Sequence, residues 1–221
     1  MALSGIVFDF DGVLFDSEKH WILVENPYLR KYIPTWKDAY YAQLVGKSLS
    51  EVYQTLVDTY GFHLTAEQYF ADYEMMAVKL YSELAKPLPK LQKLLEFIKE
   101  DSNVSVAIAS SSKPDWIMMA LRAHNLQGHF PIVITAHDSN IRRGKPAPDV
   151  YLEATRRLGL GVAQLVAIED SCSGVKAARA ANIFCVGLRN GVNDDQDLSD
   201  ANVVVNGYGE ISVDYLSELI K

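Results

Sequence analysis

The sequence has few cysteines, no excess of basic residues and no long apolar run, and each of these features excludes a class of protein. Its two cysteines, Cys172 and Cys185, have neither zinc-site spacing nor the number that a disulfide framework needs. There are 21 basic residues against 28 acidic ones, so the formal net charge is -7, which argues against a nucleic-acid surface or an anionic membrane patch. No apolar run approaches membrane-spanning length, and the first residues lack the basic region of a signal peptide. We therefore expect a cytoplasmic protein with ordinary buried thiols that binds neither nucleic acid nor membrane.

Short apolar runs recur along most of the chain, and helical spacing separates them. The runs are continuous rather than alternating, which is typical of strands that are covered on both faces of a parallel sheet. They span residues 5–11, 104–110, 131–136, 165–170, 184–188 and 202–205. The helical segments between them span residues 91–100, 114–125, 148–158 and 174–181, and Ser112 with Asp115 is expected to form a capping pair. This alternation predicts an α/β fold with a doubly wound parallel sheet.

Residues 16–85 interrupt the alternation. They contain nine of the twelve tyrosines together with Trp21 and Trp36, and their apolar residues follow a helical spacing. We therefore expect an α/β core formed by residues 1–15 and 86–221, with a helical domain, residues 16–85, inserted between the first two strands. Most of the aromatic side chains in the insertion are expected to pack its own small core.

Polar residues stand where the predicted strands end. Asp9 and Asp11 end the first strand, Ser110 and the residues after it end the second, and Glu169 with Asp170 ends the fourth. Ligand sites in open α/β sheets lie beyond the carboxyl ends of the strands. Side chains alternate along a strand, so Asp9 and Asp11 should point to the same side, where two buried like charges need a cation to compensate them.

The chemistry of these residues fits phosphoryl transfer. Carboxylate oxygens are hard ligands that suit Mg²⁺, and the expected set is Asp9, Asp11, Glu169 and Asp170. The ion would offset the clustered acids and screen an incoming phosphate from them. Asp9 could then attack phosphorus to form an aspartyl-phosphate, and Asp11 could act as general acid and then as general base.

The remaining polar residues of this sheet edge fit phosphate binding. The Ser110 hydroxyl could hold phosphoryl oxygens, and Lys145, in the loop "RRGKPAPD", could neutralise the charge that develops in the transition state. The catalytic set is thus Asp9, Asp11, Ser110 and Lys145. The residues expected to bind the substrate at this edge are Ser110, Ser111, Ser112, Lys113 and Lys145.

Four segments of the chain resemble the four motifs of the haloacid dehalogenase superfamily, in the same order and spacing. They are "DFDGVLFDSE", "AIASSSK", the lysine of "GKPAPDVY" and "AIEDSCSGVKAA". The resemblance implies a Rossmann-like core, a helical cap domain inserted after the first motif, and dependence on Mg²⁺. Superfamily members that cleave carbon–halogen bonds lack the second aspartate of the first motif. Asp11 is present, so the resemblance favours phosphoryl chemistry.

Within the superfamily, the chain resembles the branch of β-phosphoglucomutases and small sugar phosphatases. The segment "LVGKSLSEV", residues 44–52, is similar to the cap loop that contacts the substrate in that branch, which implies contacts from Trp21, Gly46 and Lys47. Two positions depart from the mutases. Leu49 stands where they have a basic residue, and Trp21 stands where they have a histidine, with His20 one residue away.

We therefore expect a Mg²⁺-dependent phosphatase that hydrolyses a small phosphorylated metabolite, a sugar phosphate, as a monomer through an aspartyl-phosphate. The alternative is a β-phosphoglucomutase-type isomerase that uses the same intermediate. A phosphonate-cleaving enzyme would need a cap lysine, for which Lys47 is a candidate in a poorly matching context. A receiver domain would be far shorter, and a dinucleotide-binding module would carry G-x-G-x-x-G after the first strand, which this chain lacks.

Overall fold

The computed structural model describes residues 2–44, 49–100 and 103–221. The chain divides into two compact units, an α/β unit of Met1–Asp16 with Lys86–Lys221 and a helical unit of Ser17–Ala85. The boundaries predicted from the sequence lie at residues 15/16 and 85/86, so the first is one residue earlier than the observed division and the second coincides with it.

The α/β unit contains a parallel sheet that is six-stranded over the described residues, in the order β3-β2-β1-β4-β5-β6. Its strands are β1 Gly5–Phe8, β2 Ser105–Ser110, β3 Ile132–Thr135, β4 Leu165–Glu169, β5 Phe184–Leu188 and β6 Val203–Val205. Every residue of the central strands β1 and β4 is buried, which explains their uninterrupted apolar sequences. The predicted α/β class and the doubly wound parallel sheet are confirmed.

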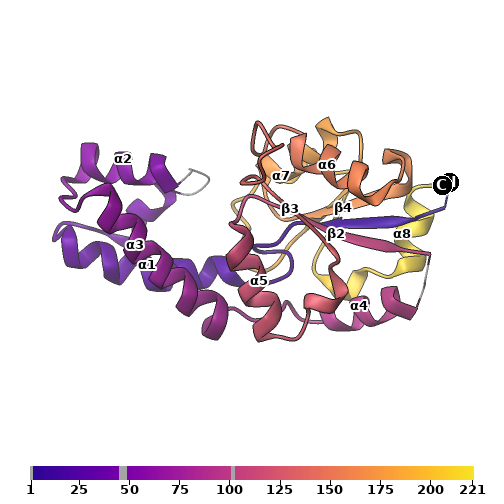
Figure 1. The fold of residues 1–221 in the computed structure, drawn as a ribbon, viewed down its shortest axis with the longest axis horizontal. Helices are drawn as coiled ribbons and strands as arrows, with labels where there is room; N and C mark the ends of the chain where they lie inside the picture. Colours follow the sequence, from indigo (N-terminus) through magenta and orange to yellow (C-terminus); the bar gives the residue numbers. More distant parts are fainter. Residues whose placement is uncertain (1, 45–48, 101–102) are drawn as a thin grey trace. The chain divides into compact units, whose positions relative to one another are not determined.

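Helices cover both faces of this sheet. Helices α6 and α7 pack on one face, and α4 and α5 lie on the other (Figure 1). The helices are α4 Leu91–Glu100, α5 Pro114–Ala123, α6 Asp149–Leu158, α7 Cys172–Ala180 and α8 Val213–Leu219, with 3₁₀ turns at Gln127–His129, Val162–Gln164 and Tyr208–Glu210. Across the described parts of the chain, no helix has both the length and the apolar character needed to cross a bilayer.

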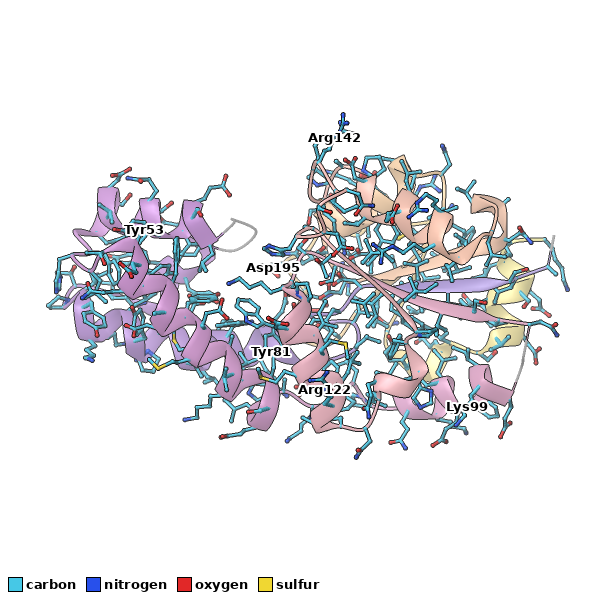
Figure 2. All side chains as sticks on the ribbon, viewed as in Figure 1. Tyr53, Tyr81, Lys99, Arg122, Arg142 and Asp195 are labelled. Carbon is cyan, nitrogen blue, oxygen red and sulfur yellow. The ribbon has the colours of Figure 1, made fainter. Side chains whose placement is uncertain are left out.

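The helical unit is built around aromatic side chains. It consists of α1 Ser17–Tyr32, a 3₁₀ turn Asp38–Gln43, α2 Leu49–Tyr60, α3 Ala66–Lys79 and a π-helical turn Leu80–Leu84. Figure 2 shows side chains from these elements, Tyr53 among them, filling its interior. Tyr69 is fully buried, and its ring lies within contact distance of Tyr53 and Phe62. The expectation that the aromatic residues pack a small helical core is confirmed.

The first strand is shorter than predicted, and both acids of the first motif lie beyond its end. Strand β1 ends at Phe8, although the Asp9 N–H still donates to the Ile168 carbonyl at 3.0 Å. The chain then turns through Gly12, whose φ of 72° is in the left-handed region that favours glycine. Asp11 therefore lies in the turn and not on the strand, so the premise that Asp9 and Asp11 share one strand is wrong, and their pointing to the same side stays a prediction.

The start of α5 also differs from the expectation. The residue at its N-cap is Lys113, and Pro114 occupies the first turn. The Ser112 hydroxyl donates to Oδ2 of Asp11 instead of capping the helix. The predicted pairing of Ser112 with Asp115 is therefore wrong, because the helix is capped at Lys113, one residue later than that pairing requires.

Candidate active site

Three carboxylates meet beyond the ends of two neighbouring strands. β1 pairs with β4 in register, Phe8 opposite Ile168, so Asp9 follows one strand where Glu169 ends the other, and Asp170 comes next. One oxygen from each of Asp9, Glu169 and Asp170 lies within 4.8 Å of the others. All three residues are buried, so their mutual repulsion is weakly screened by solvent.

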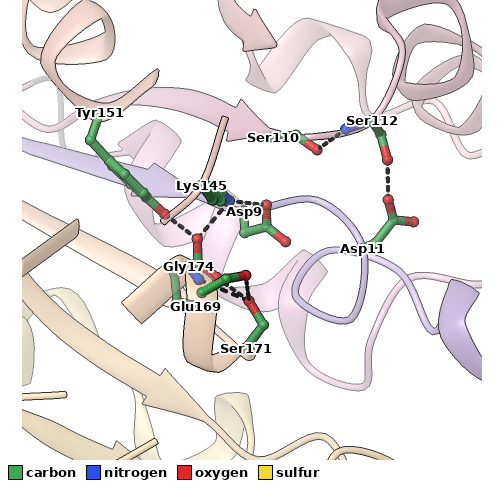
Figure 3. A network of polar contacts seen from close by, with 10 residues as sticks. Asp9, Asp11, Ser110, Ser112, Lys145, Tyr151, Glu169, Ser171 and Gly174 are labelled. Carbon is green, nitrogen blue, oxygen red and sulfur yellow. Dashed lines mark hydrogen bonds and ion pairs between the residues drawn. The ribbon is translucent and has the colours of Figure 1, made fainter. Parts of the chain in front are cut away.

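Lys145 provides a positive charge within this cluster. Its Nζ donates to Oδ1 of Asp9 and, at 2.6 Å, to Oε1 of Glu169 (Figure 3). Burial by itself would lower the pKa of the Lys145 ammonium, but the two carboxylates outweigh burial and hold that pKa above its ordinary value. Lys145 therefore places a positive charge beside Asp9, and its predicted part in neutralising phosphoryl charge stays a prediction.

Glu169 is the most enclosed member of the cluster. The Tyr151 hydroxyl donates to Oε1 of Glu169 at 2.5 Å, and the Ser171 hydroxyl lies 3.5 Å from Oε2. A Cβ atom on Gly174 would come within 1.9 Å of Oε2, so the glycine leaves the space that this carboxylate occupies. Burial raises the pKa of Glu169 to about 7, while the nearby Lys145 ammonium opposes the rise.

Asp11 and the second-strand serines form a separate polar group. Ser110 ends β2 and is buried, and its Oγ accepts the Ser112 N–H at 3.0 Å. Figure 3 shows Asp11 turned toward Ser112 and away from Lys145. The Asp11 carboxylate lies outside the three-carboxylate cluster, and its predicted part in binding a metal stays a prediction.

The other predicted substrate-binding residues have different positions. Ser111 is exposed at the end of β2, and the Lys113 ammonium lies 5.1 Å from the centre of the Trp116 ring. In the helical unit, Trp21 stacks on Tyr73 with the ring centres 4.6 Å apart, and its indole N–H points to the Tyr81 hydroxyl at 3.3 Å. Gly46 and Lys47 lie outside the described residues.

The cluster has the composition of a magnesium site. All three acidic residues offer carboxylate oxygens, the ligand type that Mg²⁺ prefers, and they are close enough to share one ion. In Glu169, Oε1 already accepts from Tyr151 and Lys145, which leaves Oε2 as the oxygen suited to a cation. The residues present therefore fit the metal that the sequence predicted.

Sequence reasoning did not identify two donors of this site. Tyr151 belongs to α6, six residues after Lys145, and Asn190 follows β5. Tyr151 stands within the quoted segment "GKPAPDVY". A tyrosine hydroxyl in the first turn of an otherwise apolar helix face could therefore have indicated a hydrogen bond at the site. Asn190 lies in a loop with no local pattern, and nothing near it in the sequence indicates an acidic partner.

Comparison with known proteins places this arrangement in a family. A family model described as haloacid dehalogenase-like hydrolase matches residues 6–188, and the chain belongs to this family of enzymes. Among curated relatives, the phosphorylated carbohydrates phosphatase of Thermotoga maritima is 26% identical over 219 residues, which is 99% of this chain and 100% of that protein. The β-phosphoglucomutase of Bacillus subtilis is 28% identical over 226 residues, covering 98% of this chain and 95% of that one.

A solved structure shares the fold. The crystal structure of β-phosphoglucomutase from Clostridium difficile superposes with a TM-score of 0.78, covers 99% of this chain and 97% of that one, and is 23% identical. The predicted superfamily and the Rossmann-like α/β core are therefore confirmed.

Proposed function

We propose that the chain is a Mg²⁺-dependent phosphatase that hydrolyses a small phosphorylated metabolite, a sugar phosphate, through a phosphorylated Asp9. The observation that carries the proposal is the buried cluster in which Asp9 contacts the Lys145 cation and lies beside two further carboxylates. An acid in that position is oriented by its hydrogen bond and adjacent to positive charge, which are properties a carboxylate nucleophile needs. The family also contains relatives named as phosphatases of small phosphorylated compounds.

The first half of the reaction transfers the phosphoryl group to the protein. An oxygen of Asp9 forms a bond to phosphorus while the bond from phosphorus to the leaving oxygen breaks. Asp11, held by the Ser112 hydroxyl, gives its proton to that leaving oxygen. Lys145 offsets the negative charge on the phosphoryl oxygens, and Ser110, with Ser111 and Lys113 nearby, contacts them.

The second half regenerates the free acid. Asp11, now ionised, takes a proton from water, the water oxygen bonds to phosphorus, and the bond to Asp9 breaks to release inorganic phosphate. Asp9, Glu169 and Asp170 would hold Mg²⁺, whose charge offsets theirs and allows a phosphate to approach. The contacts predicted for Trp21, Gly46 and Lys47, the monomeric state and the cytoplasmic setting remain parts of this proposal.

A second candidate function is phosphosugar isomerisation of the β-phosphoglucomutase kind, which uses the same phosphorylated aspartate. It is favoured by the relative of that name from Bacillus subtilis, which covers nearly the whole chain. Hydrolysis is preferred because Leu49 and Trp21 stand where the mutases carry a basic residue and a histidine.

Product analysis of one reaction series tests the proposal. Wild-type protein, Mg²⁺ and a panel of phosphorylated sugars, polyols and nucleotides should release inorganic phosphate, whereas Asp9→Asn should lower the rate on the order of 10⁴-fold or more because the nucleophile is lost. Asp214→Asn, at an exposed position of α8, is the matched control and should keep wild-type activity. β-Glucose 1-phosphate with a bisphosphate primer distinguishes the candidates, since glucose 6-phosphate would indicate the isomerase. Full phosphate release by Asp9→Asn would contradict both.

A further inference from the structure

The Asn190 side chain joins two of the loops that form the acidic cluster. It follows β5, the neighbour of β4 in the sheet, so it reaches the residue after β4. Its Nδ2 donates to Oδ2 of Asp170 at 3.0 Å and to the Gly12 carbonyl at 2.9 Å. A single amide thus holds the loop after β1 and the carboxylate after β4.

The orientation of this amide is fixed by its other contacts. Oδ1 of Asn190 accepts the Val192 N–H at 3.0 Å, and the Asn190 N–H donates to Oδ1 of Asn193 at 3.1 Å. A flipped amide would direct Oδ1 at a carboxylate and a carbonyl, both of which are acceptors. Both N–H groups therefore remain directed at Asp170 and Gly12.

The main chain of Asp170 is held separately from its side chain. The buried Asn193 donates from Nδ2 to the Asp170 carbonyl at 2.8 Å and to the Leu188 carbonyl at 2.9 Å. Asn193 therefore fixes where the peptide after β4 lies, while Asn190 fixes the direction of the carboxylate. The two asparagines have different functions, so replacement of Asn190 leaves the support of the backbone in place.

Gly12 explains why the carboxylate needs this support. A Cβ atom at position 12 would lie 1.9 Å from Oδ2 of Asp170 and 3.0 Å from Nδ2 of Asn190. The carboxylate therefore occupies space that exists only because position 12 has no side chain, and Asn190 donates to Oδ2 within that space.

We propose that Asn190 is a positioning residue that orients Asp170 for binding of a divalent cation. The inference rests on the proposed function only for the identity of that cation. Asn190 orients the acid without adding a positive charge, unlike Lys145, which would compete with a metal at the oxygen it contacts. Loss of a donor to a ligating carboxylate typically weakens metal binding by about 10- to 100-fold.

The test is direct titration of Mg²⁺ into chelator-treated, full-length protein by calorimetry, without substrate. Asn190→Ala and Asn190→Leu both remove the donor, but the leucine keeps most of the side-chain volume. Both should raise the dissociation constant of Mg²⁺ by about 10- to 100-fold. Val192→Ala, in the same loop with 47% of the residue exposed, is the matched control and should leave it unchanged. The denaturation midpoint of each metal-free variant is measured beside these titrations.

Each outcome bears on the proposal. Wild-type Mg²⁺ affinity in Asn190→Ala or Asn190→Leu overturns it. Weaker Mg²⁺ binding in the alanine variant alone also overturns it, because the lost side-chain volume and not the lost donor would then explain the effect. A lowered denaturation midpoint with unchanged affinity also overturns it. If wild-type protein releases phosphate while the Asn190 variants bind Mg²⁺ normally, only this inference fails. If the variants bind weakly but wild-type protein hydrolyses nothing, only the proposed function fails, and a wild-type protein that binds no Mg²⁺ contradicts both.

Discussion

A buried carboxylate such as Glu169 is stable only if its charge and its lone pairs find partners. Here one oxygen accepts from both the Tyr151 hydroxyl and the Lys145 ammonium, and the Lys145 ammonium in turn lies 5.4 Å from the centre of the Tyr151 ring. Hydrogen bonds to charged groups are worth more than neutral ones, because the low dielectric of the interior strengthens them. Tyr151 is thus a support of the cluster and not only a core side chain.

Removal of that hydroxyl tests this view. At a pH above the raised pKa of Glu169 of about 7, Tyr151→Phe should lower the free energy of unfolding of the metal-free protein by about 1.5–3 kcal/mol, the range for a bond to a charged acceptor. Tyr53→Phe is the matched control, since its hydroxyl donates to the neutral Leu64 carbonyl at 3.1 Å and should cost about 0.5–1.5 kcal/mol. Urea denaturation measures both. A Tyr151→Phe protein as stable as wild type would mean that Glu169 does not depend on this donor.

The sequence predicted the central residues of the site better than their surroundings. The apolar runs that precede Asp9, Glu169 and Asp170 predict two strands. In a parallel sheet the ends of these strands lie at the same edge, so the three acids are expected to meet there. The direction of Asp11 was not predictable, because it depends on where β1 ends and on the positive φ of Gly12. The contact of Asn190 with the cluster was not predictable either, because the spacing of apolar residues does not indicate the course of a loop.

At the scale of elements, the apolar patterns located five of the six described strands and the four predicted helices of the α/β unit within two residues. β5 and α4 have the predicted bounds. The predicted strand 5–11 extends three residues beyond β1 because the chain turns through Gly12 shortly after Asp9. Helix α8 was not predicted. It has seven residues, Val213–Leu219, and contributes one fully buried leucine, so it has too little periodicity to be recognised.

Helix α1 carries a buried acid whose ionisation should affect the helical unit. Glu25 accepts the Tyr41 hydroxyl at 2.5 Å, and burial raises its pKa from 4.5 to about 7, against the lowering effect of that hydrogen bond. The folded state therefore binds a proton more tightly than the unfolded state between these two values. Consequently the contribution of Glu25 to stability is complete below about pH 4.5, falls as pH rises to about 7, and is constant above it.

Replacement by a neutral isostere should remove this dependence. Glu25→Gln can still accept from Tyr41, so its stability relative to wild type should increase by about 2–3 kcal/mol between pH 5 and pH 8. Chemical denaturation across that range measures the difference. Glu67→Gln, at an exposed position of α3, is the control and should show a constant difference over the same range. A Glu25→Gln difference that is equally constant would contradict the assigned pKa.

At the scale of the whole molecule, the insertion is joined to the α/β unit by two chain segments that are tied together. The Asp16 N–H donates to the Lys86 carbonyl at 3.0 Å, and the Lys86 N–H donates to Oδ1 of Asp16 at 2.7 Å. The α/β unit supplies every residue of the acidic cluster by itself, since Asp9, Glu169 and Asp170 all belong to it. With a net charge of -7, the chain attracts an anionic substrate only through local cations, which makes Lys145 and a bound metal the expected determinants of phosphate binding.

The central claim is that the carboxyl group of Asp9 becomes a mixed anhydride with phosphate during turnover. Borohydride added during turnover reduces such an anhydride to an alcohol and leaves free carboxylates intact, so peptide mass spectrometry should find homoserine at position 9 when substrate and Mg²⁺ are present. The same treatment without substrate should leave aspartate at position 9. Reduction at a different acid, or steady phosphate release with aspartate retained at position 9, would contradict the account.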